Sequence, residues 1–337
     1  MDSNKTRPSG TSLLLQAAAA FLILALGIVL YFKPHASTSN IDAPAPGKPP
    51  VEQTVPQPPK PSDTYDTADD TAPVVEILPA ADDAQVIKAI GVTVAQLLDG
   101  SAAGLAQEAG ANAIILDMKR DDGKLEWHSQ EAAARNVGAN SGAQSINARI
   151  TAALEETGLY AIARVSAFRD HLIGFDKGCT VETLDGAMWA DNDGIHWSSL
   201  SNHVIRTYIA SCAVELTALG FDEIVMEHVT SPTCGDLALL TGGERFDAQL
   251  QMDFLAELQA AVSRTGAKLS LVMDAETFVR AEPLTALTAP MVNEYFDRVW
   301  LSEGDVSALE GAGISLGGAV TLTDALLPGG TSQAVLP

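Results

Sequence analysis

The sequence has few basic residues and few cysteines, and each shortage excludes a class of protein. Its 337 residues include 20 Lys and Arg against 43 Asp and Glu, which gives a formal net charge of −23. A nucleic-acid-binding protein needs a basic surface to neutralise phosphates, so a nucleic-acid partner is excluded. Three cysteines without a Cys-x-x-Cys pair are too few for a disulfide scaffold. Cys179 and Cys234 could still form one disulfide, whereas Cys212 lies within a predicted helix as a buried thiol.

Several motifs with known chemistry are also missing. No Gly-x-Gly-x-x-Gly fingerprint and no Walker loop follows any predicted strand, which disfavours an open nucleotide-binding sheet. The Gly-x-Ser-x-Gly elbow of serine hydrolases is absent as well. His128, His196 and His228 do not have the spacing of metal ligands. We therefore predict no metal site and no cofactor.

The N-terminal part of the chain carries one long apolar run. Residues 1–11 are polar, and residues 12–32 are apolar except for isolated polar positions such as Gln16. About 20 apolar residues are enough for a helix to cross a bilayer core of ~30 Å. Lys5 and Arg7 precede the run, so the positive-inside rule predicts a single-pass cell-membrane protein with a cytoplasmic N-terminus and an extracellular remainder. The alternative is a cleaved signal peptide, whose apolar region is normally ~7–15 residues.

Residues 33–84 have the composition of a disordered linker. Eleven of the seventeen prolines lie between Pro34 and Pro79, among Thr, Ser, Asp and Gln residues. Such a segment buries too little apolar surface to offset its ordering entropy, and its prolines favour an extended conformation. A proline-rich ligand for a recognition module is the alternative. A stalk that holds a domain away from the membrane fits better beside an anchor.

From residue 85 to residue 325 the sequence alternates between strand and helix patterns. Expected strands lie at 86–94, 112–119, 160–168, 223–229, 268–274, 298–302 and 314–321, and expected helices at 95–109, 146–157, 202–219 and 246–265. Three helices end in glycine just before the next strand, at Gly110, Gly158 and Gly220. Repeated units of this kind imply a parallel sheet with right-handed crossovers. The fold class is therefore α/β, with a TIM-type barrel favoured.

The predicted barrel lacks its last strand. After Thr321 only sixteen residues remain, and no further strand pattern is evident among them. We therefore expect a barrel that is shortened or degenerate at its C-terminal end, followed by a C-terminal tail over residues 326–337.

Acidic residues follow the apolar part of several predicted strands. Asp117, Glu227 and Asp274 stand at or near the ends of the second, fourth and fifth strands. In a barrel these strand ends meet at the rim where active sites form. Arg164 lies within an apolar strand, where an unpaired charge is costly, so we expect it to pair with Asp117 or Glu227. Tryptophans on a loop beside such carboxylates are typical of a sugar site.

Four segments resemble a known family. Two of them are similar to motifs of bacterial glycosyl hydrolase domains of largely unassigned activity, and they occur in the same order. The first is Ala113–Lys119 with Asp122-Gly123, and the second is Gly158–Val165 with Phe168-Arg169-Asp170. The loop that carries Trp189 and Trp197 and the Leu219–Ile224 segment also match, so the resemblance covers residues 88–232. Where the family continues with an aspartate, tyrosine and arginine, this chain keeps only an acidic residue, Glu227.

The resemblance implies an alpha-amylase-like TIM barrel that acts on cell-wall or environmental polysaccharide, or on the glycan of peptidoglycan. In such an enzyme Glu227 would be the proton donor, with Asp274 or Asp117 as the second carboxylate. The expected substrate-binding residues are Arg164, Asp170, Trp189, Trp197 and His228. The altered motif after Glu227 favours an alternative, a non-catalytic carbohydrate-binding or envelope-organising domain on a degenerate barrel.

Overall fold

The structure, a computed structural model, describes residues 86–240, 247–275, 278, 287–314 and 316–337. The predicted N-terminal segment 1–11, the anchor over 12–32 and the linker over 33–84 lie outside these residues. Among the residues that are described, no helix has the length and apolarity needed to cross a bilayer.

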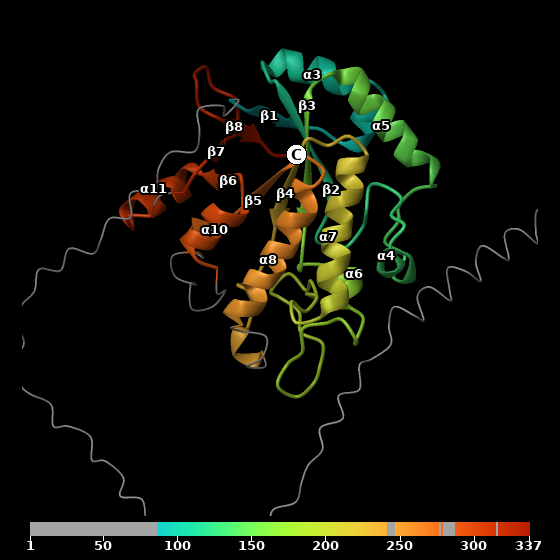
Figure 1. Cartoon of the computed structure of the whole chain (residues 1–337), viewed down its shortest axis with the longest axis vertical. Helices are drawn as coiled ribbons and strands as arrows, with labels where there is room; N and C mark the ends of the chain where they lie inside the picture. Colours follow the sequence, from blue (N-terminus) through green and yellow to red (C-terminus); the bar gives the residue numbers. More distant parts are fainter. Residues whose placement is uncertain (1–85, 241–246, 276–277, 279–286, 315) are drawn as a thin grey trace, which may run out of the picture. The chain divides into compact units, whose positions relative to one another are not determined.

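Eight parallel strands close into a barrel in sequence order, from β1 to β8, and β8 pairs back onto β1 (Figure 1). The strands are β1 Lys88–Gly91, β2 Ala113–Lys119, β3 Tyr160–Ser166, β4 Glu223–Glu227, β5 Lys268–Val272, β6 Arg298–Ser302, β7 Ala319–Leu322 and β8 Gln333–Val335. In β2 both faces are covered, so alternate residues can all be apolar, and Ala113, Ile114, Ile115 and Leu116 are fully buried. The predicted TIM-type fold class is confirmed.

The expectation of a missing eighth strand was wrong. The last strand, β8, is only three residues long and lies inside the segment expected to be a tail. It pairs with β7 through Thr321 and Leu322 and with β1 through Lys88, Ala89 and Ile90. Closure removes both unpaired sheet edges, so a short strand of modest propensity is held by its two neighbours.

The helices lie outside the strands. They are α2 Val94–Leu98, α3 Ser101–Ala109, α4 Ala132–Asn136, α5 Ser145–Thr157, α6 His171–Gly174, α7 His203–Ala218, η1 Leu237–Leu239, α8 Ala248–Ser263, α10 Ala289–Tyr295 and α11 Glu303–Gly311. The single helix expected over 95–109 is divided, because Gly100 adopts a positive φ of 82° between α2 and α3. Gly110 and Gly158 end α3 and α5 in the left-handed conformation, as their positions predicted.

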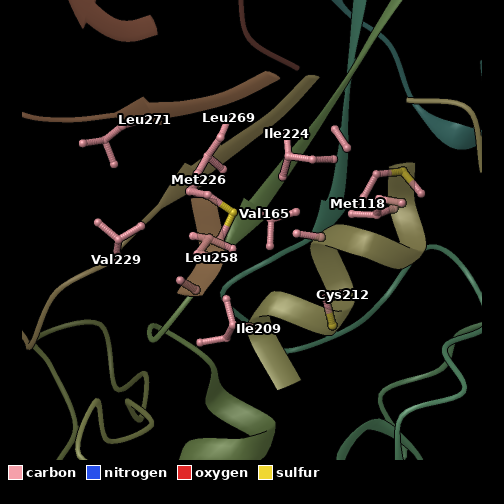
Figure 2. Close-up of a cluster of buried hydrophobic side chains, with 14 of the residues drawn as sticks. Met118, Val165, Ile209, Cys212, Ile224, Met226, Val229, Leu258, Leu269 and Leu271 are labelled. Atoms are coloured by element: carbon pink, nitrogen blue, oxygen red, sulfur yellow. The ribbon is translucent and has the colours of Figure 1, made fainter. Parts of the chain in front are cut away.

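The core has two parts, one inside the barrel and one between the barrel and its helices. Figure 2 shows the outer part, where strand residues such as Met118, Val165 and Met226 pack towards Cys212 of α7 and Leu258 of α8. The inner part includes Ile115 of β2, Ile162 of β3, Val225 of β4, Trp300 of β6 and Val320 of β7. Because side chains alternate along a strand, every second residue from these inward positions also faces the barrel interior.

A buried polar network around Glu223, the first residue of β4, closes the barrel interior at the N-terminal ends of the strands. Its carboxylate is fully buried, forms an ion pair with Arg298 and accepts hydrogen bonds from Ser270 Oγ at 2.6 Å and Tyr160 Oη at 3.0 Å. This network lies at the N-terminal ends of the strands, the end of a barrel that contributes stability.

Candidate active site

The alternation of side chains along the strands brings three charged residues together inside the barrel, near the C-terminal ends of β2, β3 and β4. Asp117 lies two residues after the inward-facing Ile115, Arg164 two after Ile162, and Glu227 two after Val225. Asp117 and Arg164 are also register partners between β2 and β3. The strand pattern thus explains why these side chains converge, although they lie far apart in the sequence.

Arg164 connects the two carboxylates. Its Nε and Nη2 donate to Asp117 Oδ1 and Oδ2 at 2.5 and 2.8 Å, and its Nη1 donates to Glu227 Oε1 at 3.3 Å. The prediction that Arg164 pairs with Asp117 or Glu227 is confirmed for both partners. Arg164, Asp117 and Glu227 line a small charged hollow of about 330 Å³, which also contains Asp121 and Ser166; we call it the charged hollow.

Glu227 also faces a second and larger hollow, the mouth hollow, with a volume of about 440 Å³. Its polar lining comes from Glu227, His228, Thr230, Thr233, Asp274 and Asp305, and its apolar lining includes Trp197, Leu271, Met273, Phe278, Leu287 and Leu322. Burial raises the pKa of Glu227, Arg164 acts to lower it, and the charges of Asp121 and Asp117 raise it further. Glu227 therefore has the environment of a carboxyl group that keeps its proton at higher pH than usual.

His228, the next residue, has an unusual backbone. Its φ of 52° makes it the one non-glycine residue with a positive φ in the described part of the chain. The ring meets Trp197 edge-on at 5.4 Å between centroids, and Nε2 lies 3.7 Å from Asp121 Oδ1. Burial lowers the pKa of His228 to about 4, although Asp121 acts to raise it. The imidazole that lines the mouth hollow is therefore neutral near pH 7.

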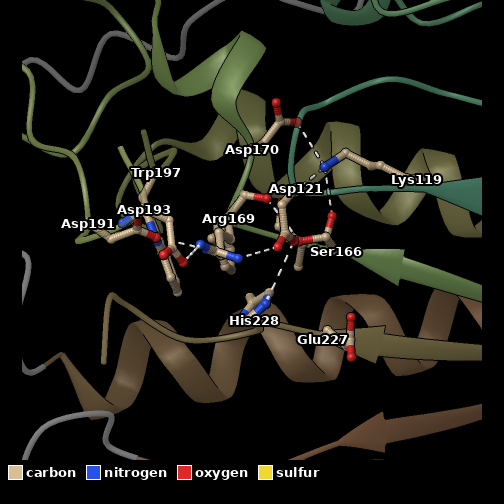
Figure 3. Close-up of polar contacts among 12 residues, drawn as sticks. Lys119, Asp121, Ser166, Arg169, Asp170, Asp191, Asp193, Trp197, Glu227 and His228 are labelled. Atoms are coloured by element: carbon tan, nitrogen blue, oxygen red, sulfur yellow. Dashed lines mark hydrogen bonds and ion pairs between the residues drawn. The ribbon is translucent and has the colours of Figure 1, made fainter. Parts of the chain in front are cut away.

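Arg169 holds together the loops that follow β2 and β3, a role that was not predicted from the sequence. It forms ion pairs with Asp121 and with Asp191 at 2.8 Å and Asp193 at 2.7 Å (Figure 3). Burial alone would raise the pKa of Asp191, but hydrogen bonds from Arg169 and from Trp197 Nε1 outweigh burial and lower it. The acid-rich composition of these loops was visible in the sequence, but the cation at their centre was not distinguishable from any other loop arginine.

Asp170, expected to bind substrate, is engaged within the protein. Its side chain is buried, accepts from Lys119 Nζ at 2.8 Å and caps α6 through a hydrogen bond from the Ile173 amide at 3.0 Å. Lys119 also donates to the Ser166 carbonyl oxygen at 2.6 Å. Asp170 thus fixes the start of α6 beside the site, and its role towards substrate stays a prediction.

The two loop tryptophans are buried, with 2% of Trp189 and 1% of Trp197 exposed. Trp189 donates from Nε1 to the Asp236 carbonyl oxygen at 3.1 Å and packs closely against Gly235. Trp197 still borders the mouth hollow. Neither ring presents an open face to solvent, so sugar stacking on both of them stays a prediction. Asp274, by contrast, is exposed and lines the mouth hollow together with Glu227.

The cysteines and the possible metal-binding side chains of the described residues can also be located. Cys179, Cys212 and Cys234 are all free in the structure, where no disulfide joins Cys179 to Cys234. Across the described ranges, no group of three or more His, Cys, Asp or Glu side chains is arranged to hold a metal ion.

Several solved structures resemble the chain at low sequence identity. A hypothetical protein from Ruminiclostridium thermocellum has 23% identity over 56% of this chain and 99% of its own, with a TM-score of 0.47. Ega3 from Aspergillus fumigatus, solved in complex with galactosamine, has 12% identity over 75% of this chain and 86% of its own, with a TM-score of 0.41. The GH36 alpha-galactosidase AgaA from Geobacillus stearothermophilus has 13% identity over 76% of this chain and 39% of its own, with a TM-score of 0.48.

No protein with a curated description matches the chain by sequence. The family described as "Putative glycosyl hydrolase domain" matches residues 89–282, which include most of β1, all of β2 to β5, and Asp117, Arg164 and Glu227. The match covers more than half of the 337 residues. The chain therefore belongs to the "Putative glycosyl hydrolase domain" family.

Proposed function

We propose that the barrel is a glycoside hydrolase in which Glu227 is the proton donor. Family membership supports the reaction class. The single observation that carries the proposal is the position of Glu227, a largely desolvated carboxyl group with a raised pKa between the charged hollow and the mouth hollow. Glycosidic bond cleavage needs an acid that is still protonated at working pH to protonate the leaving oxygen.

Asp117 is the better supported second carboxylate. It shares the guanidinium of Arg164 with Glu227, and both line the charged hollow. Asp274 lines the mouth hollow together with Glu227 and lies two residues after the end of β5. In this arrangement Arg164 fixes the orientation of Asp117 through two hydrogen bonds, while its longer bond to Glu227 is the one that a substrate can replace.

The same arrangement favours a second candidate function, a non-catalytic glycan-binding domain. Both carboxylate oxygens of Asp117 accept hydrogen bonds from Arg164. These bonds engage the oxygens that Asp117 would need as a nucleophile or as a base. Binding of a glycan without release of any product distinguishes this candidate from the enzyme.

We place the domain outside the cell, tethered by a membrane helix over residues 12–32 through the linker over 33–84. Its substrate would be cell-wall or environmental polysaccharide, including the glycan of peptidoglycan. The support is the apolar run with preceding basic residues and the proline-rich composition that follows it. Protease treatment of intact cells should remove the domain; survival of the domain while known surface proteins are cut would contradict this orientation.

The enzymatic proposal is tested by incubating the chain with a panel of polysaccharides and measuring the reducing ends that are released. The 337-residue chain should release product from at least one glycan, and Glu227→Gln should reduce the rate about a hundredfold or more. Glu108→Gln is the matched control, because Glu108 is an exposed carboxylate on α3. An unchanged rate in Glu227→Gln, with wild-type thermal stability in both variants, would contradict the assignment.

A further inference from the structure

A group of three aromatic rings lies on the loop that follows β3. Phe175 and His171 stack with centroids 6.0 Å apart, and His196 lies 5.1 Å from Phe175 and 5.3 Å from His171. The rings of Phe175 and His171 border a hollow of about 550 Å³, which Val137, Leu172, Asp176 and Lys177 also line. We call this surface the Phe175 platform.

The exposure of Phe175 is unusual for this chain. Its side chain is 59% exposed, and among the exposed large hydrophobic side chains of the described residues it alone is aromatic. The four tryptophans are all buried. An exposed ring of this size leaves apolar area in water that a ligand can cover. If a ring stacks on a sugar at an open surface of this domain, Phe175 is the ring available for it.

The backbone beneath the platform is held firmly. Asp170 caps α6 through the Ile173 amide, and the His171 amide donates to the Asp121 carbonyl oxygen at 2.8 Å. Gly174 lies against the backbone of residues 196 and 197, where an added Cβ would meet main-chain atoms at 2.8 Å. His196 Nδ1 lies 2.8 Å from the Trp189 carbonyl oxygen. The rings are therefore pre-positioned, which lowers the entropic cost of binding.

The platform is joined to the candidate active site by adjacent residues. His196 contributes its ring to the platform, and the next residue, Trp197, borders the mouth hollow beside Glu227. On the other side, Asp121 accepts from the His171 amide and pairs with Arg169. The platform and the mouth hollow are therefore connected through the same packed loop.

We propose that the Phe175 platform is a glycan-binding subsite that holds a polysaccharide chain by stacking a sugar ring on Phe175. The inference rests on the proposed function, which supplies the glycan as ligand. An aromatic face contacts the apolar face of a sugar, while Asp176, Lys177 and His171, which line the hollow, can hydrogen-bond its hydroxyl groups. The formal charge of −23 disfavours a strongly anionic polymer, so the expected ligand is a neutral or amino-sugar polysaccharide.

Co-sedimentation of the 337-residue chain with insoluble chitin, cellulose and purified peptidoglycan tests the subsite. The wild-type chain should bind at least one of these, and Phe175→Ala should weaken that binding about tenfold, the equivalent of losing one partly buried aromatic contact. Phe175→Trp should retain binding, because it keeps the stacking face. Val204→Ala, at a side chain that is 62% exposed on α7, is the control and should bind like wild type.

Two further comparisons separate the subsite from catalysis. In a Glu227→Gln background, Phe175→Ala should weaken binding by the same factor as it does in the wild-type chain, since Glu227 lies outside the platform. Binding that depends on Phe175 without any hydrolysis by the wild-type chain would retain the subsite and refute the enzyme. No binding to any of the three polysaccharides, or equal binding by Phe175→Ala and Val204→Ala, would overturn the subsite.

Discussion

Arg164 and Asp117 form a bidentate ion pair across neighbouring strands, with nitrogen–oxygen distances of 2.5 and 2.8 Å. The third nitrogen of the same guanidinium reaches Glu227 at 3.3 Å. The cation is thus held by Asp117 and remains close enough to Glu227 to oppose the effect of burial on its pKa.

Replacing Arg164 with Met should raise the pKa of Glu227 further, because the nearby positive charge that lowers it is removed. The pH above which activity declines should move upward if Glu227 acts as an acid. The variant should also lose about 2 kcal/mol of unfolding free energy, since Asp117 loses its partner in a partly buried place. NMR titration of labelled glutamate side chains and urea denaturation check both effects. Arg264→Met, at an exposed position after α8, is the control, and an unmoved Glu227 titration would contradict the prediction.

The backbone of His228 gives a prediction about side-chain shape. Its φ of 52° is tolerated by Asn but opposed by β-branched residues. His228→Val should therefore be less stable than His228→Asn by roughly 1–2 kcal/mol. The same pair of substitutions at His203, the first residue of α7, should differ by less than about 0.5 kcal/mol, because Val and Asn have similar helix propensities. Equal differences at the two positions, measured by urea denaturation, would refute the strained backbone.

The titration of His228 predicts how stability changes with pH. Its folded-state pKa of about 4 lies below the unfolded value, so the unfolded state binds more protons between these values. The stability that comes from a neutral His228 is present above about pH 6.5 and is lost as the pH falls to about 4. Because the imidazole is partly exposed and screened, we expect a loss of about 1–2 kcal/mol.

Comparison with His228→Asn isolates this contribution. The raised pKa of Glu227 acts in the opposite direction, with stability lost as the pH rises through it, but Glu227 is present in both proteins. Urea denaturation at about pH 7 and about pH 4.5 should show a smaller loss in the variant than in the wild-type chain. Identical losses in the two proteins would contradict a lowered pKa of His228 in the folded state.

The stability of the protein should be sensitive to the loss of one charge from the Glu223 network, at the N-terminal ends of the strands. Glu223→Gln would leave Arg298 as a buried cation without its partner and should cost about 3–5 kcal/mol. Arg120→Gln, in an ion pair whose two side chains are about half exposed, should cost less than about 1 kcal/mol. Denaturation curves that place the two variants at the same stability would refute a structural role for the Glu223 network.

Much of the fold could be predicted because the strands are covered on both faces and read as continuous apolar runs. Strand β6 was predicted at its observed bounds, 298–302, and α5 was predicted within one residue. The eighth strand could not be predicted, because three residues, Gln333 to Val335, carry no periodicity of their own and are held only by β1 and β7.

The site was predictable where charge conflicts with its surroundings. Arg164 in an apolar strand required a partner, and it has two. The tryptophans were less informative, because stacking on a sugar and burial under a loop favour the same residue, and burial occurred in both. The importance of Arg169 depends on three aspartates that only the folded loops bring together.

The role of Glu227 as a proton donor is tested most directly by varying the leaving group of the substrate. For the sugar that the wild-type chain hydrolyses, rates should be compared between a dinitrophenyl glycoside, whose leaving group needs no protonation, and a methyl glycoside, whose leaving group does. Glu227→Gln should lose about a hundred- to ten-thousand-fold on the methyl glycoside and far less on the dinitrophenyl glycoside. Equal losses on both substrates, or no loss on either, would contradict the assignment of Glu227 as the acid.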